Sequence, residues 1–243
     1  MPNVPEPGTV VVFLPAHDEE ATVAALVGRA PTAVAGQPVT VVVVDDGSTD
    51  GTAAAAAAAG ATVLSLGRNR GLGAAVREGL ALAVAGGAAA VAFLDADGEY
   101  APEELATVVG PVLAGTADYV VGSRFAGNGE GHGLRRAMRL HRWVGNRVLT
   151  AWVRRMVRRY GVRDLTDGQS GYRALSREAA AAAEIVHDFN YAQVLTLDLL
   201  AKGFRYAEVP ISYRFRRHGQ SFVTLGTYLR RVVPAVRIER RSG

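Results

Sequence analysis

Two carboxylates at the end of an apolar run are the residues best suited to chemistry in this 243-residue chain. Residues 91–94 have the character of a buried strand and lead directly into Asp95 and Asp97, with Glu99 two positions further on. Three acids this close repel one another, and a divalent cation would relieve the repulsion. Mg²⁺ and Mn²⁺ prefer hard oxygen ligands, commonly one or two carboxylates together with substrate phosphates. The spacing indicates a clamp for a metal ion and a diphosphate, although a solvated turn has the same composition.

Acidic residues also follow the two earlier segments that read as buried strands. Residues 10–14 form an apolar run that Pro15 is expected to stop, and residues 39–44 form a second run of β-branched residues. The loops after these runs are acidic, with Asp18 and Glu19 after the first and Asp45 and Asp46 after the second. In open α/β sheets, ligands bind outside the carboxyl ends of the strands. The three pairs of acids are therefore expected to converge on one crevice.

The order of the elements in the first half predicts an α/β fold. Crossovers of helix length allow neighbouring strands to run parallel. We therefore expect a doubly wound, mostly parallel sheet with helices on both faces. The expected helices are 21–30, 52–59, 72–85 and one opening at residues 102–104, and the further strands are 62–66, 88–94 and 118–122.

The second half of the chain is basic and less regular. After a glycine-rich loop, residues 134–160 contain nine arginines and no acid, and their apolar residues recur with helical spacing. Such a helix either lies on anionic lipid or packs its apolar stripe on the domain. The remaining expectations are a polar loop at 164–173, helices at 177–185 and 191–202, a strand pair at 205–209 and 211–215 hinged at Pro210, and a basic amphipathic tail at 228–241.

Composition excludes several classes of site. The chain has no cysteine, which rules out disulfides, thiolate metal sites and cysteine nucleophiles. The net charge of +4 comes mainly from the arginine-rich second half, so that half should meet an anionic partner. The first residues have neither the basic nor the apolar region of a signal peptide, and no apolar run is long enough to span a membrane. We expect a cytoplasmic protein, or one at the cytoplasmic face of the membrane.

Taken together and in order, these motifs resemble family 2 glycosyltransferases of the GT-A fold, and within them the dolichyl-phosphate mannose synthase-like group. The resemblance implies one GT-A domain over residues 1–243, with a nucleotide-sugar half at 9–125, an acceptor half at 126–221 and the basic amphipathic tail at 222–243. The segments that carry it are Pro-Ala-His-Asp-Glu at 15–19, the acidic stretch at 44–52, Asp-Ala-Asp at 95–97, Gly-Ser-Arg-Phe at 122–125, residues 167–173 and Val-Pro-Ile at 209–211.

The resemblance implies roles for the residues of the first half. The donor would be GDP-mannose or UDP-glucose, and the cofactor a divalent metal, Mn²⁺ or Mg²⁺. Metal binding is implied for Asp95, Asp97 and Glu99, the last at a position where relatives often have a glutamine. Contact with the nucleotide sugar is implied for Pro15, Ala16, His17, Glu19, Asp46, Asp95, Ala96 and Asp97.

On the acceptor side, the resemblance implies a polyprenyl or dolichyl phosphate that receives mannose or glucose with inversion. Basic positions that match are Arg124, Arg135, Arg139 and Arg216, and the catalytic set is Asp97, Arg124 and Asp167. A lipid phosphate is already an anion and needs no base, whereas a hydroxyl acceptor would need one, for which Asp167 is the best candidate. Two departures fall on this side, because Phe222 stands where relatives often have a lysine and Gln193 lies near a position where they commonly have a glutamate.

Three other classes of protein fit less well. Residues 71–76 begin like a dinucleotide fingerprint but lack its third glycine, and acids rather than glycines follow the first strand. A nucleotidyltransferase acting on sugar phosphates would carry a glycine-rich loop with a basic residue after that strand, and this chain has no such loop there. A non-enzymatic scaffold or nucleic-acid binder would interleave aromatic and basic residues for stacking, whereas Trp143 and Trp152 fit helix packing. We therefore expect no nucleic-acid partner.

Overall fold

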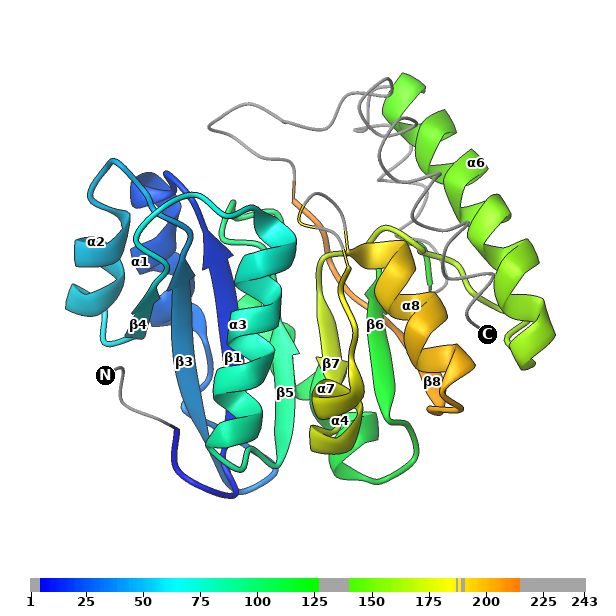
Figure 1. Ribbon diagram of the computed structural model, residues 1–243, viewed down its shortest axis with the longest axis horizontal. Coiled ribbons are helices and arrows are strands. Elements are labelled where there is room, and N and C mark those ends of the chain that lie inside the picture. The colour runs from blue at the N-terminus through cyan, green and yellow to red at the C-terminus, as the bar shows by residue number, and fades with distance from the viewer. Residues whose placement is uncertain (1–4, 127–139, 187, 189–190, 215–243) are drawn as a thin grey trace.

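A single mixed sheet with helices on both faces forms the body of the molecule (Figure 1). The structure, a computed structural model, describes residues 5–126, 140–186, 188 and 191–214, with backbone alone described at 140–144 and 146. The strands follow the order β2-β3-β1-β5-β7-β6-β8, and β4 pairs with β3 on its own. The expected α/β architecture is confirmed.

The first half of the chain builds the parallel part of this sheet. Strand β1 lies between β3 and β5 and runs parallel to both, and β4 runs parallel to β3. Each predicted helix and strand of this half is present, and a short strand, β2, adds an antiparallel hairpin that the sequence did not predict. The strands are β1 (Val10–Ala16), β2 (Ala33–Val34), β3 (Gln37–Asp45), β4 (Thr62–Ser65) and β5 (Ala90–Phe93), and the helices are α1 (Glu20–Arg29), α2 (Thr52–Ala58) and α3 (Leu72–Ala85).

The expectation that Pro15 ends the first strand is wrong. Strand β1 continues to Ala16, and Pro15 pairs with Val44 of β3. The reason is that the backbone nitrogen of Pro15 faces β5. The carbonyl of Phe13 accepts from the N–H of Leu94 on the β5 side, and the backbone groups of residues two apart in a strand face the same neighbouring strand. Since β5 ends at Phe93, the missing N–H of Pro15 removes no bond of the ladder.

The second half departs from the expected parallel order. Strand β7 (Arg173–Leu175) runs antiparallel between β5 and β6 (Tyr119–Ser123), whereas the sequence placed residues 164–173 in a loop. Strand β8 (Tyr206–Pro210) runs parallel to β6. The predicted second strand after Pro210 is not formed by residues 211–214, whose backbone instead crosses toward Glu99 and Glu104.

Two apolar layers flank the sheet because its buried strands alternate their side chains. Val10, Val12 and Leu14 face α1 and α4 (Leu105–Leu113), which a 3-10 turn at Pro102–Glu104 introduces as predicted. Val11 and Phe13 face α3, α7 (Arg177–Ala182) and α8 (Ala192–Ala201), where Phe13 stacks on Phe93 with ring centroids 5.0 Å apart.

The basic segment forms a helix that packs on α8 rather than standing apart. Helix α6 (Leu140–Val157) and the turn η2 (Arg158–Tyr160) bury Val153, Met156 and Val157 against Leu165 and Leu197. The expected amphipathic helix is confirmed over residues 140–160, while residues 134–139 and the predicted tail at 222–243 lie outside the described residues. None of the helices among the described residues is long and apolar enough to cross a membrane.

Candidate active site

The loops that follow β1 and β3 are bound to each other at the carboxyl edge of the sheet, the upper edge in Figure 1. The backbone N–H of Asp18 donates to Ser48 Oγ at 3.0 Å, and Thr49 N–H donates to Asp18 Oδ1 at 2.7 Å. The N–H of Glu19 donates to Thr52 Oγ1 at 2.8 Å. Side chains from one loop thus satisfy backbone groups of the other, which gives the edge a fixed shape before any ligand arrives.

Asp46 connects this edge to the loop before α3. Its Oδ1 accepts from the N–H of Arg70 at 2.7 Å and its Oδ2 from the N–H of Gly71 at 2.8 Å, while only 4% of the residue is exposed. The neighbouring Asp45 is equally buried and accepts from Ser65 Oγ at 3.1 Å. These aspartates order three loops, and the contact of Asp46 with a nucleoside stays a prediction.

The other residues expected to hold the nucleotide lie at the end of β1. Pro15 and Ala16 are buried, whereas His17 and Glu19 are half-buried. His17 Nε2 lies 3.5 Å from Asp18 Oδ2, and its buried Nδ1 has no hydrogen-bond partner. The structure therefore brings the predicted nucleotide residues of β1 to the same edge as Asp46.

Asp95, Ala96 and Asp97 follow β5 at this edge. Both aspartates are half-buried, and Ala96 is buried with its carbonyl accepting from Thr22 Oγ1 of α1 at 2.6 Å. Asp97 Oδ1 accepts from the N–H of Glu99 at 3.0 Å, a local bond that fixes the turn. The bond from Thr22 to Ala96 and the turn at Asp97 thus hold the backbone that carries the two carboxylates.

Glu99 does not join them in a three-carboxylate site. Only 8% of Glu99 is exposed, its side chain is hydrogen-bonded to Tyr213, and its carbonyl accepts from the N–H of Arg214 at 2.8 Å. Burial, followed by the charge of Glu99, raises the pKa of Tyr213. Within the part of the chain that the structure describes, no three His, Asp or Glu side chains gather so as to hold a metal ion. Metal binding by Glu99 therefore stays a prediction, and its side chain contacts Tyr213 in this structure.

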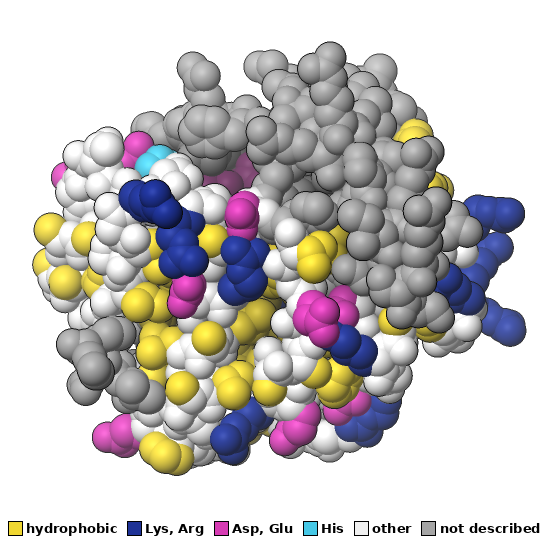
Figure 2. All heavy atoms as spheres, viewed as in Figure 1, with side chains coloured by type: hydrophobic (Ala, Val, Ile, Leu, Met, Phe, Trp, Pro, Cys, Tyr) yellow, Lys and Arg dark blue, Asp and Glu magenta, His cyan; other side chains and the backbone are white. Residues whose placement is uncertain are grey.

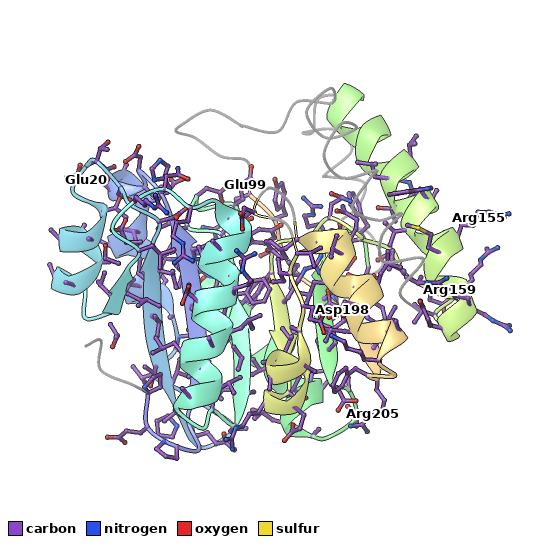
Figure 3. All side chains as sticks on the ribbon, in the orientation of Figure 1. Glu20, Glu99, Arg155, Arg159, Asp198 and Arg205 are labelled. Carbon is purple, nitrogen blue, oxygen red and sulfur yellow. The ribbon has the colours of Figure 1, made fainter. Side chains whose placement is uncertain are left out.

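Asp95 and Asp97 nevertheless fit a divalent cation. Their donors are the hard carboxylate oxygens that Mg²⁺ and Mn²⁺ prefer, and two protein carboxylates are the usual number where substrate phosphates complete the shell. Both side chains stay partly accessible at the edge where the nucleotide residues lie. Figure 3 shows Glu99 at the same upper edge of the molecule.

Arg124 and Asp167 form a buried ion pair beyond the end of β6. Arg124 Nε donates to Asp167 Oδ2 at 2.7 Å and Nη2 donates to Oδ1 at 2.9 Å. Asp167 is fully buried and Arg124 is 7% exposed. The guanidinium also lies over the ring of Tyr213, 5.1 Å from its centroid, so the pair touches the segment that holds Glu99.

The pairing bears on the predicted role of Asp167. Burial alone would raise the pKa of this carboxyl, but the charge and hydrogen bonds of Arg124 lower it below its usual value. A carboxylate with a lowered pKa and both oxygens engaged is a weak proton acceptor. The structure thus does not favour Asp167 as a general base, and contact of Arg124 with a phosphate stays a prediction.

Two features of the 164–173 loop were not found from the sequence. Glu208 of β8 accepts from the N–H of Thr166 at 2.9 Å and from that of Asp167 at 3.2 Å, which fixes the loop on the sheet. Arg173 is fully buried, with Nε donating to the carbonyl of Ser170 at 2.9 Å and Nη1 donating to that of Ala192 at 2.8 Å. The only available signal was the density of polar residues in this loop.

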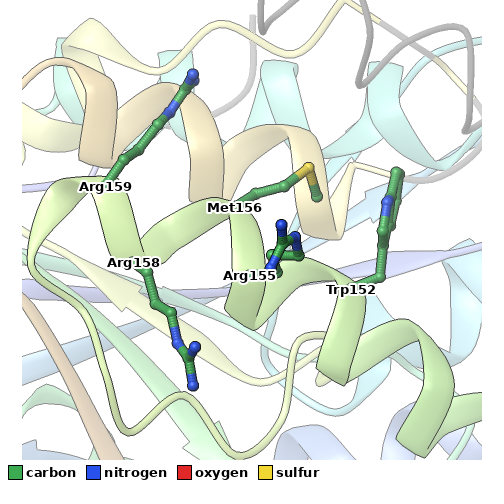
Figure 4. Close-up of a pocket in the computed structure, with 5 residues that line it drawn as sticks. All are labelled: Trp152, Arg155, Met156, Arg158 and Arg159. Carbon is green, nitrogen blue, oxygen red and sulfur yellow. The ribbon is translucent and has the colours of Figure 1, made fainter.

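A hollow of about 400 Å³ lies beside α6 and η2 (Figure 4). Trp152 and Met156 provide its apolar wall, and Arg155, Arg158 and Arg159 surround it. Arg155 and Arg159 project away from the sheet (Figure 3), and basic side chains cover this edge of the molecule (Figure 2). The predicted acceptor residues Arg135, Arg139 and Arg216 lie outside the described residues.

Comparison with known proteins identifies the fold and family. Residues 11–181 match the model of glycosyl transferase family 2. The chain is 30% identical over 225 residues to polyprenol monophosphomannose synthase of Mycolicibacterium smegmatis, covering 87% of this chain and 79% of that protein. It is 29% identical over 238 residues to undecaprenyl-phosphate mannosyltransferase of Micrococcus luteus, covering 94% and 93%.

A solved structure shows the same architecture. Glucosyl-3-phosphoglycerate synthase from Mycobacterium tuberculosis, crystallised with Mn²⁺, UDP and glucosyl-3-phosphoglycerate, superposes with a TM-score of 0.70. The sequence identity is 27%, and the match covers 96% of this chain and 80% of the other. These findings confirm the resemblance read from the motifs and rule out the oxidoreductase and binding-protein alternatives. The chain belongs to glycosyl transferase family 2 and is a glycosyltransferase of the GT-A fold.

Proposed function

We propose that the protein is a metal-dependent, inverting transferase that moves a hexose, mannose or glucose, to a polyprenyl or dolichyl phosphate. The donor is a nucleoside-diphosphate sugar, GDP-mannose or UDP-glucose. Relatives named for polyprenol-phosphate and undecaprenyl-phosphate mannosyl transfer match most of the chain, which supports a lipid-phosphate acceptor. The Mn²⁺ and UDP bound by the glucosyl-3-phosphoglycerate synthase support a nucleotide-sugar donor and a divalent metal.

The observation that carries the choice of acceptor is the ion pair between Arg124 and Asp167. A sugar hydroxyl must lose its proton as it attacks, which requires a carboxylate within hydrogen-bond reach. Asp167, the best candidate for that role by sequence, has both oxygens engaged by Arg124 and no exposed surface. A lipid phosphate attacks as an anion and needs no base, so the engaged carboxylate does not hinder it.

In the proposed reaction, a phosphate oxygen of the acceptor attacks the anomeric carbon from the face opposite the diphosphate. The new carbon–oxygen bond forms as the bond from that carbon to the diphosphate oxygen breaks, so the configuration inverts and the nucleoside diphosphate leaves with the electron pair. The transition state has oxocarbenium character, as in glycoside hydrolysis. No proton is transferred in this step, in agreement with the lack of a free base at Asp167.

Different residues of the carboxyl edge would bind different parts of the donor. Pro15, Ala16, His17, Glu19 and Asp46 would contact the nucleoside, and Asp95 and Asp97 would hold the metal beside Ala96. When bound, Mn²⁺ or Mg²⁺ stabilises the negative charge that develops on the departing diphosphate. The bonds from Thr22 to Ala96 and from Glu99 to Asp97 orient the two carboxylates in advance, which lowers the cost of binding. Arg124 would lie near the phosphates, with its charge largely compensated by Asp167.

A hydroxyl acceptor remains the second candidate, because the matched solved structure contains glucosyl-3-phosphoglycerate, the product of transfer to a phosphorylated hydroxy acid. The two candidates differ in the product. The protein with Mn²⁺ is incubated with GDP-mannose or UDP-glucose, each with a short polyprenyl phosphate or with 3-phosphoglycerate, and the products are analysed by mass spectrometry. A glycosyl-phosphoprenol is the expected product. Glycosylated 3-phosphoglycerate with no lipid product would refute the lipid-phosphate acceptor.

The matched control for this experiment is Asp97→Asn. Asparagine retains an oxygen that can accept from the N–H of Glu99, but it lacks the charge that a metal ion needs. Product formation should fall by at least about 100-fold while the fold is kept. Normal turnover of this variant with Mn²⁺ present would refute the proposal that Asp97 holds a metal ion.

We also infer that the protein associates with anionic membrane at the cytoplasmic face, through the outer side of α6. Val148 is 62% exposed there, and Trp152, one turn further along, is half-buried with one side packed on the domain. Among the described residues, Arg155 and Arg158 have no ion pair, so their charges are open to anionic headgroups. Arginines beside an exposed apolar side chain on a helix are compatible with the membrane interface.

Co-sedimentation with vesicles tests this association. Vesicles of phosphatidylglycerol and phosphatidylcholine should bind the protein, and Arg155→Glu with Arg158→Glu should weaken binding by about tenfold or more, since each basic residue near an anionic surface contributes about 1 kcal/mol. Arg177→Glu, which reverses one charge at the start of α7, is the control for Arg155→Glu alone and should have the smaller effect of the two. Equal binding of all variants to the vesicles would exclude this face of α6 as the membrane-binding surface.

A further inference from the structure

Gly171 lies in direct contact with the carboxylate of Asp95. A side-chain carbon placed on Gly171 would lie 2.3 Å from Asp95 Oδ2 and 2.9 Å from its Cγ. Contacts this short are essentially absent from real structures, so no residue larger than glycine fits while Asp95 keeps its present position. The two residues are brought together by the fold, since they come from the ends of neighbouring strands β5 and β7.

The backbone at Gly171 cannot easily move away from Asp95. Its N–H donates to the hydroxyl of Tyr100 at 2.7 Å, and Tyr100 belongs to the same loop as Asp95 and is 2% exposed. On the other side, Arg173 pairs with Phe93 in the sheet, and its Nε donates to the carbonyl of Ser170 at 2.9 Å. The turn is thus fixed to the loop of the carboxylates at one end and to the sheet at the other.

From this geometry we propose that Gly171 is a positioning residue for Asp95: the bare Cα sets where the Asp95 carboxylate lies, and hence the metal site. The inference rests on the proposed function, in which Asp95 and Asp97 hold the metal ion. It assigns a role to a residue that contacts neither donor nor acceptor in that proposal. Because β7 runs antiparallel beside β5, the turn before β7 lies next to the loop after β5 that carries Asp95.

Backbone conformation alone does not require glycine at this position. Gly171 is absent from the glycines with positive φ, so alanine is compatible with the local backbone. The group that must yield to alanine is instead the end of the rotatable Asp95 side chain, which has to move by about 1 Å to reach an ordinary contact distance. A displacement of that size at a reacting centre costs about 100-fold in rate. The fold should survive while the metal site is lost.

The test compares Gly171→Ala with Gly168→Ala, a glycine of the same buried loop. A side-chain carbon at Gly168 would lie 3.4 Å from Val153, an ordinary contact. Mn²⁺ binding is measured from the electron paramagnetic resonance signal of free Mn²⁺, with GDP or UDP present. We expect Gly171→Ala to weaken Mn²⁺ binding by at least tenfold, and Gly168→Ala to leave it unchanged. Urea unfolding checks that both variants keep the fold.

A double variant separates positioning from a general structural role. In an Asp95→Asn background, which already lacks the charged ligand, Gly171→Ala should weaken Mn²⁺ binding no further. If alanine lowers the unfolding midpoint, Asp95→Ala should restore it, because removal of the carboxylate removes the clash. A full additional loss of Mn²⁺ binding in the double variant, or an unfolding midpoint that Asp95→Ala does not restore, would overturn the inference.

The same measurement distinguishes failure of the inference from failure of the proposed function. Wild-type protein that binds no Mn²⁺ with either nucleotide would refute the metal site and the inference with it. Wild-type protein that binds Mn²⁺, loses it on Asp95→Asn and keeps it on Gly171→Ala would refute the inference alone.

Discussion

Two aspartate–arginine pairs with nearly the same geometry allow the effect of burial to be measured directly. Asp167 accepts from the N–H, Nε and Nη2 of Arg124, and Asp118 accepts from the same three groups of Arg205. The arginine side chains are 7% and 57% exposed, and the aspartates 0% and 22%. Replacing each aspartate by asparagine removes one negative charge and preserves the shape of the side chain.

The structure predicts very different costs for the two variants. Asp167→Asn leaves the Arg124 guanidinium buried without its counter-charge, and loss of one partner of a buried pair costs about 3–5 kcal/mol of unfolding free energy. Asp118→Asn leaves Arg205 in water, where such pairs contribute about 0–1 kcal/mol. The difference of at least about 2 kcal/mol should come mainly from burial, since the contacts with arginine correspond and the one extra bond of Asp167, from the N–H of Gln169, can also be made by asparagine.

Urea unfolding followed by tryptophan fluorescence measures both values, because the chain has two tryptophans. With a slope of about 3 kcal/mol/M, the midpoint of Asp167→Asn should fall by about 1 M or more, and that of Asp118→Asn by under about 0.3 M. Equal shifts for the two variants would refute the argument from burial. A loss below about 1 kcal/mol for Asp167→Asn would show that the Arg124–Asp167 pair is not needed to hold the loop.

The pH dependence of stability follows from the same pair. The pKa of Asp167 is lowered in the folded protein, so the stabilisation by Arg124 is fully present above the unfolded value of about 3.9. As the pH falls below that value toward the folded pKa, the unfolded chain takes up a proton first and the stabilisation is lost. The free energy of unfolding of the wild type should therefore fall more than that of Asp167→Asn between about pH 5 and about pH 3. Urea unfolding at each pH measures both values.

Three further changes test other parts of the structure. Asp97→Ala should abolish Mn²⁺-stimulated product formation, measured by donor consumption over a range of Mn²⁺ concentrations. Gly47→Ala should cost about 2 kcal/mol or more by urea unfolding, because Gly47 has φ +69° and a side-chain carbon would lie 2.3 Å from the Arg68 backbone. Ser176→Ala should cost about 1 kcal/mol in the same assay, since Ser176 Oγ accepts from Ala179 N–H at the start of α7.

Much of the first half of the chain could be predicted because its signals are local. Helix α3 begins and ends where its periodicity indicated, and acids after β1, β3 and β5 share an edge because parallel strands end together. Pro15 was misjudged because its effect depends on which neighbour its missing N–H faces, and this is known only once β5 is seen to end at Phe93.

The second half was harder because its contacts are distant in sequence. Strand β7 has three residues and begins with Arg173, whose buried guanidinium donates to the carbonyls of Ser170 and Ala192 rather than forming a pattern visible in the sequence. Arg124 and Asp167 are 43 positions apart, so nothing in either motif indicated that the two predicted catalytic residues bind each other. Polar density indicated that the 164–173 loop matters, but not what its residues contact.

The use of carboxylates in the second half bears on which acceptor the enzyme takes. Asp167 is bound by Arg124, Glu208 accepts from Thr166 N–H at 2.9 Å, and Asp198 pairs with Lys202 at 2.7 Å. Each of these acids is engaged in holding a loop or a helix, and a general base must instead have a lone pair directed at the acceptor. None of these three acids could serve as a base toward a hydroxyl acceptor unless its contact broke, at the cost of the loop or helix it holds. An acceptor that arrives as an anion requires no such change, so the same contacts that stabilise this half favour transfer to a phosphate.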